Sequence, residues 1–245
     1  KVSVCPAAVD VQAFAARDSG AQLTLLAPLP LNPKKDADEI SKLCRKISAS
    51  WSGGVTLARE KMEGDQVIEP GFRSPQIGAL HALQAHWTVS KKIATVVMPT
   101  GTGKTETMIA AGVQERSKCL LVIVPSDALR TQIADAFEQL GILPRAGLLD
   151  LGARLPVVSL LRKRPSVEEA RNLFDMSNVV ITTMSIAAAV SPQIQAAMAE
   201  CASHLFIDEA HHVAARTWRE FREAFGNVKT VQFTATPFRN DGMRV

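Results

Sequence analysis

Short apolar runs alternate with helix-like stretches from residue 72 onward. The runs are rich in Val, Ile, Leu and Phe and lack polar alternation, which indicates parallel strands buried on both faces. Between them, apolar residues recur at the three- and four-residue spacing of a helix face. This alternation predicts an α/β fold with a mostly parallel, helix-sandwiched sheet. The predicted strands are Ile93–Met98, Leu120–Val124, Val179–Thr183, Leu205–Asp208 and Val228–Thr234, and the predicted helices are Asp127–Leu140, Ser166–Met176 and Ala214–Phe225.

The first 71 residues have a different character. Ala27–Glu39 is rich in proline and charge, which is typical of a connection. The residues after it predict a helix, and we therefore expect 1–71 to form a small N-terminal accessory region or the tail of a preceding domain. Residues 72–245 are then the main domain. The predicted helix has one apolar face, made by Ile40, Leu43, Cys44, Ile47 and Trp51.

Composition sets only broad limits. The chain of 245 residues carries a net charge of +4 and 47% hydrophobic residues, as in an ordinary soluble domain. It has no apolar run long enough to span a membrane, and Lys1 is not followed by a secretory signal. The four cysteines lack metal-ligand spacing. These features predict a cytoplasmic piece of a longer protein, without a structural metal or a membrane partner.

A glycine-rich segment, MPTGTGKTE, joins the first predicted strand to a helix. Its glycines let the backbone bend around an anion, and the helix N-terminus offers N–H groups to phosphate. Lys104 would reach the β- and γ-phosphates, and the Thr105 hydroxyl would bind Mg²⁺. Met98 stands where the generic motif has glycine, so a glycine-rich turn with a chance lysine is the alternative. The expected nucleotide-binding residues here are Thr100, Gly101, Thr102, Gly103, Lys104, Thr105 and Glu106.

Two adjacent acids, in LFIDEAHH, end another predicted strand. Neighbouring carboxylates repel each other at a buried sheet edge unless they face a metal ion or water. Asp208 fits a Mg²⁺-holding role, and Glu209 fits the general base that deprotonates the attacking water. The alternative is a helix start whose acids complement the dipole. His211 and His212 have no zinc-site spacing. In TATPFRNDG, Thr234 ends the last predicted strand and Thr236 lies two residues further on, and both could sense the acidic pair and a bound strand.

Together and in this order, GKT, DEAH and TAT resemble superfamily 2 helicases, and most closely the branch with the helicase subunits of restriction endonucleases. The resemblance covers about residues 72–242 and implies a RecA-like P-loop NTPase domain, the first of two such lobes. It implies ATP and Mg²⁺ as cofactors, with Lys104, Asp208 and Glu209 as catalytic residues. It also implies that His211, Thr234 and Thr236 couple ATP to the nucleic acid. In this family the first loop position is commonly not glycine, which agrees with Met98.

The segment FRSPQ resembles the adenine-recognition segment of the family. The resemblance implies that Gln76 reads the adenine edge and that Arg73 contacts or stacks on the base. Pro75 stands where the family often has tyrosine. Another interpretation, which can hold at the same time, is a helix start with Ser74 as its cap and Pro75 in the first turn.

Two further strand ends resemble segments that touch the nucleic-acid backbone. The resemblance implies that Ser126 and Arg130 contact phosphates, and that Thr182 and Thr183 do the same. Such contacts hold phosphate without reading base sequence, as a moving motor requires. The basic run at residues 162–164 could extend this track, although such runs are more often solvated loops.

The expected function is an ATP-dependent nucleic-acid helicase or translocase. The expected partners are nucleic acid, a second RecA-like lobe, and nuclease or defence-complex subunits. The sequence of the TAT segment resembles that of DNA helicases, which favours DNA over RNA. Since the chain stops soon after Thr236, we expect it to bind nucleotide but to turn over little without the second lobe. The alternatives are a nucleotide-gated clamp or scaffold that does not unwind, and a P-loop kinase, which would leave DEAH and TAT unexplained.

Overall fold

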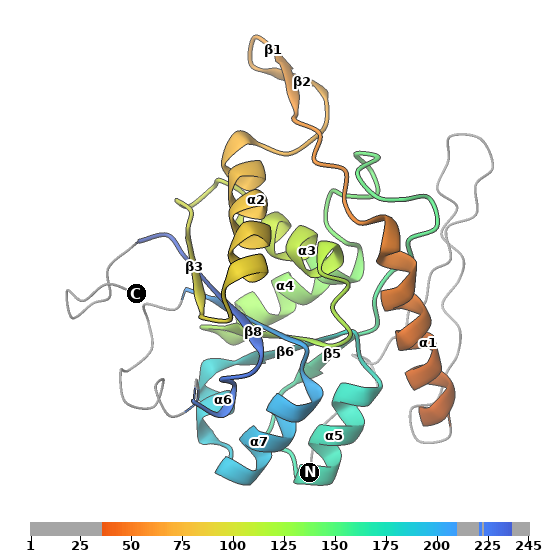
Figure 1. The fold of residues 1–245 in the computed structure, drawn as a ribbon, viewed down its shortest axis with the longest axis vertical. Helices are drawn as coiled ribbons and strands as arrows, with labels where there is room; N and C mark the ends of the chain where they lie inside the picture. Colours follow the sequence, from red (N-terminus) through yellow and green to blue (C-terminus); the bar gives the residue numbers. More distant parts are fainter. Residues whose placement is uncertain (1–35, 210–220, 222, 237–245) are drawn as a thin grey trace.

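A single parallel sheet of six strands organises the molecule (Figure 1). The computed structural model describes residues 36–209, 221 and 223–236. All neighbouring strands in this sheet run parallel, in the order β3-β8-β7-β4-β6-β5. The predicted mostly parallel α/β architecture is therefore confirmed. The strands are β3 (Ala94–Val97), β4 (Leu120–Val124), β5 (Val158–Leu161), β6 (Val179–Thr183), β7 (His204–Asp208) and β8 (Lys229–Thr234).

Helices cover both faces of the sheet, as Figure 1 shows. Helices α1 to α4 pack over one face, and α5 and α7 over the other, with α6 beside β6 and β4. The helices are α1 (Ala37–Ser50), α2 (Ser74–Val89), α3 (Lys104–Gln114), α4 (Asp127–Glu138), α5 (Val167–Asp175), α6 (Met184–Ala189) and α7 (Pro192–Cys201), and a short 3₁₀ turn, η1 (Trp51–Gly53), follows α1.

The central strands divide their side chains between two apolar cores. In β4, Leu120, Val122 and Val124 enter the core under α1 to α4, whereas Leu121 and Ile123 enter the core under α5 and α7. Successive residues of a strand point to opposite faces. A strand buried on both faces must therefore be apolar at every position, which explains the unbroken apolar run.

Strand β3 departs from the expected pattern. It was predicted to be buried on both faces, but its residues alternate between buried and exposed, and Val97 is 45% exposed. The reason is its place at the edge of the sheet, where β8 is its one neighbour among the described strands. Strand β5, helices α6 and α7, and a two-stranded hairpin of β1 (Lys61–Glu63) and β2 (Gln66–Glu69) were not predicted. The predicted helix Ala214–Phe225 lies mostly outside the described residues.

Helix α1 packs on the same core as the sheet. Ile40, Cys44 and Ile47 are buried in it, and the side-chain amide of Asn178 donates to the Cys44 carbonyl at 2.9 Å. The proposed boundary at residues 71 and 72 stays a prediction, because these contacts show only that residues on both sides of it pack together. The described helices include none that combines the length and the apolar character of a membrane span.

Candidate nucleotide and nucleic-acid site

The chemistry-bearing residues follow one edge of the sheet. The carboxyl ends of parallel strands meet at the same edge, and ligands of open α/β sheets bind there. From the strand order, the phosphate loop after β3 comes first, then the TAT segment after β8, then the acidic pair at the end of β7. The ends of β4, β6 and β5 follow. The topology thus gathers the expected nucleotide residues on one half of the edge and the expected nucleic-acid residues on the other.

The phosphate loop is shaped by two glycines in the left-handed region. Gly101 has φ 81° and Gly103 has φ 89°, values that a residue with a Cβ adopts only under strain. A Cβ on Gly103 would also collide with the side chain of Gln76. Helix α3 begins at Lys104, directly after this turn, so its first N–H groups face the place where an anion would lie.

The carbonyl of Gly103 is held by three donors. It accepts hydrogen bonds from Gln76 Nε2 at 3.1 Å and from the Thr107 hydroxyl and N–H at 3.0 Å each. The C=O and N–H of a trans peptide point in opposite directions. Fixing this carbonyl therefore aims the N–H of Lys104 away from Gln76. Gln76 is 3% exposed, so its amide is a buried brace of the phosphate loop.

Arg73 also holds the phosphate loop. Its Nη1 donates to the Gly101 carbonyl at 2.5 Å, and its Nε lies 3.8 Å from the carboxylate of Glu60. Arg73, and not Ser74, is the N-cap of α2, and its N–H donates to Gln76 Oε1 at 2.7 Å. The expected cap at Ser74 was wrong, because the helix already includes it. Adenine contact by Arg73 and Gln76 stays a prediction, beside the loop-holding contacts that the sequence did not indicate.

Lys104 and Glu209 form an ion pair. Both side chains are more than four-fifths buried, which strengthens the attraction relative to an exposed pair. Glu209 has φ 52°, a left-handed conformation that a non-glycine residue adopts at some cost and that is common at functional sites. The structure thus brings the predicted phosphate-binding lysine to the predicted general base, although they are far apart in sequence.

Asp208 lies beside this pair in a desolvated position. Burial, assisted by the neighbouring charge of Glu209, raises its pKa to about 6, whereas Lys104 opposes the shift. Its Oδ1 is buried and has no hydrogen-bond partner in the described part of the chain. A buried carboxylate oxygen without a partner costs free energy. A divalent cation would remove that cost, so Asp208 fits a magnesium ligand, with Thr105 in the neighbouring first turn of α3.

The Glu106 carboxylate contacts the backbone that follows α4, and its contact with nucleotide stays a prediction. Its Oε2 accepts a hydrogen bond from the N–H of Ile142 at 3.0 Å, in the segment after α4. Burial raises the pKa of Glu106. Sequence reasoning placed Glu106 with the nucleotide because of its neighbours in the motif; the contact to residue 142 has no local sequence signal.

The other described residues that were predicted to bind nucleotide or to couple lie in the phosphate loop or at the end of β8. Thr100 is exposed, and the Thr102 hydroxyl donates to the Pro99 carbonyl at 2.6 Å. The Thr234 hydroxyl donates to the Thr236 carbonyl at 2.9 Å and accepts from the Thr236 N–H at 3.2 Å. This local ring fixes the turn after β8. His211 lies outside the described residues.

The predicted nucleic-acid residues lie on the second half of the edge, but most are buried. Ser126 caps α4, accepting from the Leu129 N–H at 3.4 Å. Arg130 is 4% exposed and lies 3.0 Å from the carboxylate of Asp127. Burial lowers the pKa of Arg130, and the charge of Arg162 lowers it further. Arg162 therefore lies within electrostatic range of Arg130.

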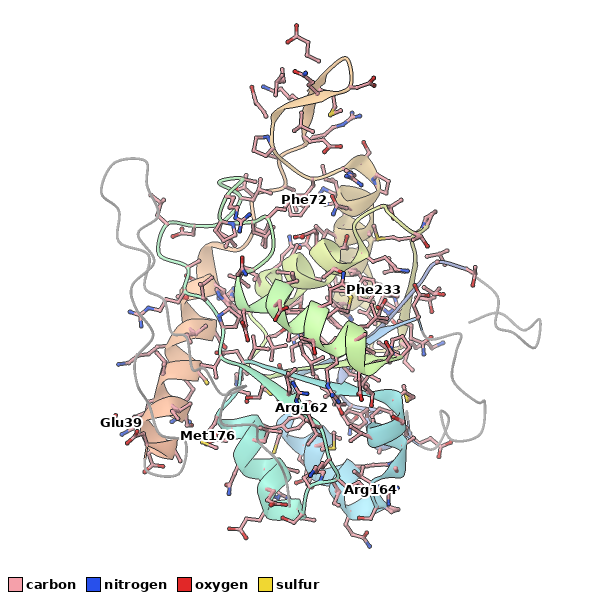
Figure 2. All side chains as sticks on the ribbon, turned by 180° about the vertical axis from the view of Figure 1, so that it is seen from behind. Glu39, Phe72, Arg162, Arg164, Met176 and Phe233 are labelled. Carbon is pink, nitrogen blue, oxygen red and sulfur yellow. The ribbon has the colours of Figure 1, made fainter. Side chains whose placement is uncertain are left out.

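The threonines of β6 are engaged inside the fold. The Thr182 hydroxyl donates to the Leu161 carbonyl at 3.0 Å, and the Thr183 hydroxyl lies 3.0 Å from that of Ser185. Phosphate contact by these side chains stays a prediction. The Thr182 hydroxyl would first have to release the Leu161 carbonyl, whereas the Ser126 hydroxyl accepts in its contact with Leu129 and can still donate to a phosphate oxygen. The basic run at residues 162–164 is exposed at the end of β5, where Figure 2 labels Arg162 and Arg164.

One protein family matches most of the chain. The family "Type III restriction enzyme, res subunit" matches residues 69–239. No curated protein matches the chain.

Among solved structures, the crystal structure of UvsW from bacteriophage T4 is similar at 18% identity and a TM-score of 0.48, over 78% of this chain and 34% of that one. A structure of the UvsW helicase from bacteriophage T4 is similar at 16% identity and a TM-score of 0.47, over 94% of this chain and 85% of that one. The chain thus spans about a third of the length of the first of these structures.

The family match covers more than half of the chain and includes the phosphate loop, the acidic pair and the TAT segment. The chain therefore belongs to the family of the type III restriction enzyme res subunit, and its helicase-type ATP-binding domain is the first RecA-like lobe of a superfamily 2 helicase.

Proposed function

We propose that the chain is the ATP-binding lobe of an ATP-dependent helicase or translocase that acts on DNA in preference to RNA. The observation that carries this proposal is the meeting, at one sheet edge, of Lys104 at the start of α3 with Asp208 and Glu209 at the end of β7. A lysine, a carboxylate oxygen that has no hydrogen-bond partner among the described residues, and a second carboxylate supply groups that phosphoryl transfer to water requires.

In the proposed mechanism, Lys104 exchanges Glu209 for the β- and γ-phosphates of ATP. The N–H groups at the start of α3 bind the same phosphates. Glu209, released from the lysine, accepts a proton from the attacking water as general base. Thr105 and Asp208 would hold Mg²⁺, which supplies positive charge against the phosphate oxygens when it is bound. Arg73 and Gln76 hold the loop carbonyls, and we propose that they also approach the adenine.

Glu209 also offers a route from ATP to the nucleic acid. Its Oε2 accepts from the backbone N–H of Ala235, inside the TAT segment. A change in the contacts of Glu209 on ATP binding would therefore reach Thr234 and Thr236 directly. We propose that His211, which follows the acidic pair in sequence, takes part in the same coupling.

The proposed nucleic-acid track runs along the ends of β4, β6 and β5. Ser126, Arg130, Thr182 and Thr183 would contact the backbone, and the exposed run at residues 162–164 would add sequence-independent charge. In superfamily 2 helicases a second lobe clamps ATP against the first, and its arginines can accelerate hydrolysis by about 10³–10⁵. We propose that such a second lobe and nuclease or defence-complex subunits are partners of this chain, and that it acts in the cytoplasm.

The competing function is a nucleotide-gated clamp that binds nucleic acid without moving. Hydrolysis should be measured for the chain joined to the second lobe of its parent protein, with single-stranded DNA, duplex DNA and RNA. The proposal expects DNA to stimulate hydrolysis at least about tenfold, and Glu209→Gln to remove that activity. Nucleotide binding with hydrolysis that neither DNA nor Glu209→Gln alters would favour the clamp.

A further inference from the structure

The loop that follows α4 is tied to the phosphate-binding helix by one carboxylate. Glu106 lies in the first turn of α3, two residues after Lys104, and accepts a hydrogen bond from the N–H of Ile142 at 3.0 Å. Helices α3 and α4 lie side by side in Figure 1. This contact therefore joins the start of one helix to the end of the other.

The backbone at the contact is shaped to receive the carboxylate. Leu140 and Gly141 both lie in the left-handed region, with φ of 53° and 56°. A Cβ on Gly141 would lie 2.9 Å from Glu106 Oε1 and still closer to Oε2. Only glycine leaves room for the carboxylate here, so the close approach is built into the turn.

The loop itself is firmly fixed to α4. The N–H of Gly141 donates to the Ala136 carbonyl at 2.8 Å, and that of Leu140 to the Phe137 carbonyl at 3.0 Å. Leu140 and Leu143 are buried in the core. A displacement of Glu106 would therefore move α4 as a whole, because hydrogen bonds and buried leucines fix the turn to this helix.

Helix α4 connects this contact to the expected nucleic-acid residues. Ser126 is its N-cap and Arg130 lies in its first turns. We propose that Glu106 is a positioning residue that holds α4 against the nucleotide-binding end of α3 and so transmits nucleotide binding to the helix that carries Ser126 and Arg130. The inference rests on the proposed function, and it gives Glu106 a role in coupling in place of nucleotide contact.

Amide hydrogen exchange of the chain, with and without Mg²⁺-ADP, tests this inference. Two segments are compared: residues 98–107, which hold the phosphate loop, and residues 139–148, which hold the Glu106 contact. In the wild-type chain ADP should slow exchange in both segments, by about threefold or more. Glu106→Met keeps the bulk of the side chain but has no acceptor oxygen. In this variant ADP should slow exchange only in residues 98–107.

Three variants sharpen the result. Glu106→Gln keeps an acceptor oxygen for Ile142 and should behave as wild type, whereas Glu106→Ala should repeat the Glu106→Met result if methionine disturbs folding. Arg145→Ala removes an exposed side chain of the same loop, which donates to Gln139 at 3.2 Å, and should also behave as wild type.

The outcomes separate the two claims. If ADP slows amide exchange of residues 139–148 in Glu106→Met and Glu106→Ala as much as in wild type, the inference is overturned. Slowing in the wild type confined to residues 98–107 would overturn it as well, and would leave nucleotide binding intact. No slowing in either segment of the wild-type chain would overturn the proposed function, and the inference with it.

Discussion

Glu209 Oε2 accepts a hydrogen bond from the backbone N–H of Ala235 at 3.3 Å. The other carboxylate oxygen of Glu209 is bound by Lys104 of the phosphate loop. One side chain at the end of β7 therefore contacts the loop after β3 and the segment after β8. In this arrangement the carboxylate engages the lysine that the phosphates of ATP would need.

Glu209→Gln should separate binding from hydrolysis. A neutral amide competes less with phosphate for Lys104, so ADP affinity should stay the same or rise a few-fold. Hydrolysis should fall by about 10²–10⁴, the usual contribution of a general base. Calorimetry with ADP and a phosphate-release assay on the chain joined to the proposed second lobe measure the two effects. Undiminished hydrolysis would remove Glu209 from the role of base.

Asp208→Asn should stabilise the chain above pH 6 when no nucleotide is added. The pKa of Asp208 is raised to about 6, so folding favours its protonated form. The resulting penalty is absent below the unfolded pKa, grows as the pH rises toward 6, and is constant above that, at up to about 3 kcal/mol. Urea unfolding at pH 7.5 and pH 4 should show a gain for the Asp208→Asn variant that disappears at the lower pH. An equal gain at both pH values would show that burial of the charge is not its cause.

Mg²⁺ provides a companion measurement on the same pair of proteins. Added Mg²⁺-ADP should raise the melting temperature of wild type more than that of Asp208→Asn, because the amide oxygen is a weaker ligand. Equal shifts would argue against Asp208 as a metal ligand.

Gln76→Ala should weaken binding of pyrophosphate as well as of ADP. Gln76 braces the Gly103 carbonyl, so its loss should loosen the phosphate loop and lower both affinities by about three- to tenfold. Gln84→Ala, the same substitution two turns later in α2, is the matched control and should change neither. A loss confined to ADP would assign Gln76 to adenine recognition alone.

Glu115→Gln should cost stability at neutral pH and little in acid. His204, 3.8 Å away, and Lys229, 2.6 Å away, hold the pKa of Glu115 below its usual value. The stabilisation is present above the unfolded pKa and is lost as the pH falls through the lower folded pKa. We expect a loss of about 1 kcal/mol at pH 7 that shrinks in acid. Glu63→Gln, on the exposed hairpin, should change stability little at either pH.

The sequence predicted those parts of the fold that local pattern determines. The bounds of β4 and β6 were predicted correctly, because strands buried on both faces must be apolar throughout. Strand β5 was missed, because Ser159 interrupts a short apolar run and is buried through a hydrogen bond to Ser177 that only the fold creates. The exposed face of β3 was missed because edge position is a property of the whole sheet.

In the candidate site, too, the sequence predicted the residues of local motifs but not the contacts between residues distant in sequence. The motifs predicted Lys104, Asp208 and Glu209, and the strand order brings them to one edge of the sheet. The motifs did not indicate that Gln76 and Arg73 hold loop carbonyls, or that Glu106 faces Ile142. They also did not indicate that Arg130 is buried. Each of these depends on which residues distant in sequence meet in space.

Calorimetric titration of the chain with Mg²⁺-ATP and Mg²⁺-ADP, beside Lys104→Ala, tests the central claim most directly. The account predicts one site per chain in the wild type, with a dissociation constant of about 10 μM to 1 mM, and no measurable binding in Lys104→Ala. Circular dichroism of the variant should remain that of the wild type, since Lys104 lies outside both apolar cores. A wild-type chain that binds neither nucleotide, or a Lys104→Ala chain that binds as tightly, would contradict the assignment of this lobe as an ATP-binding domain.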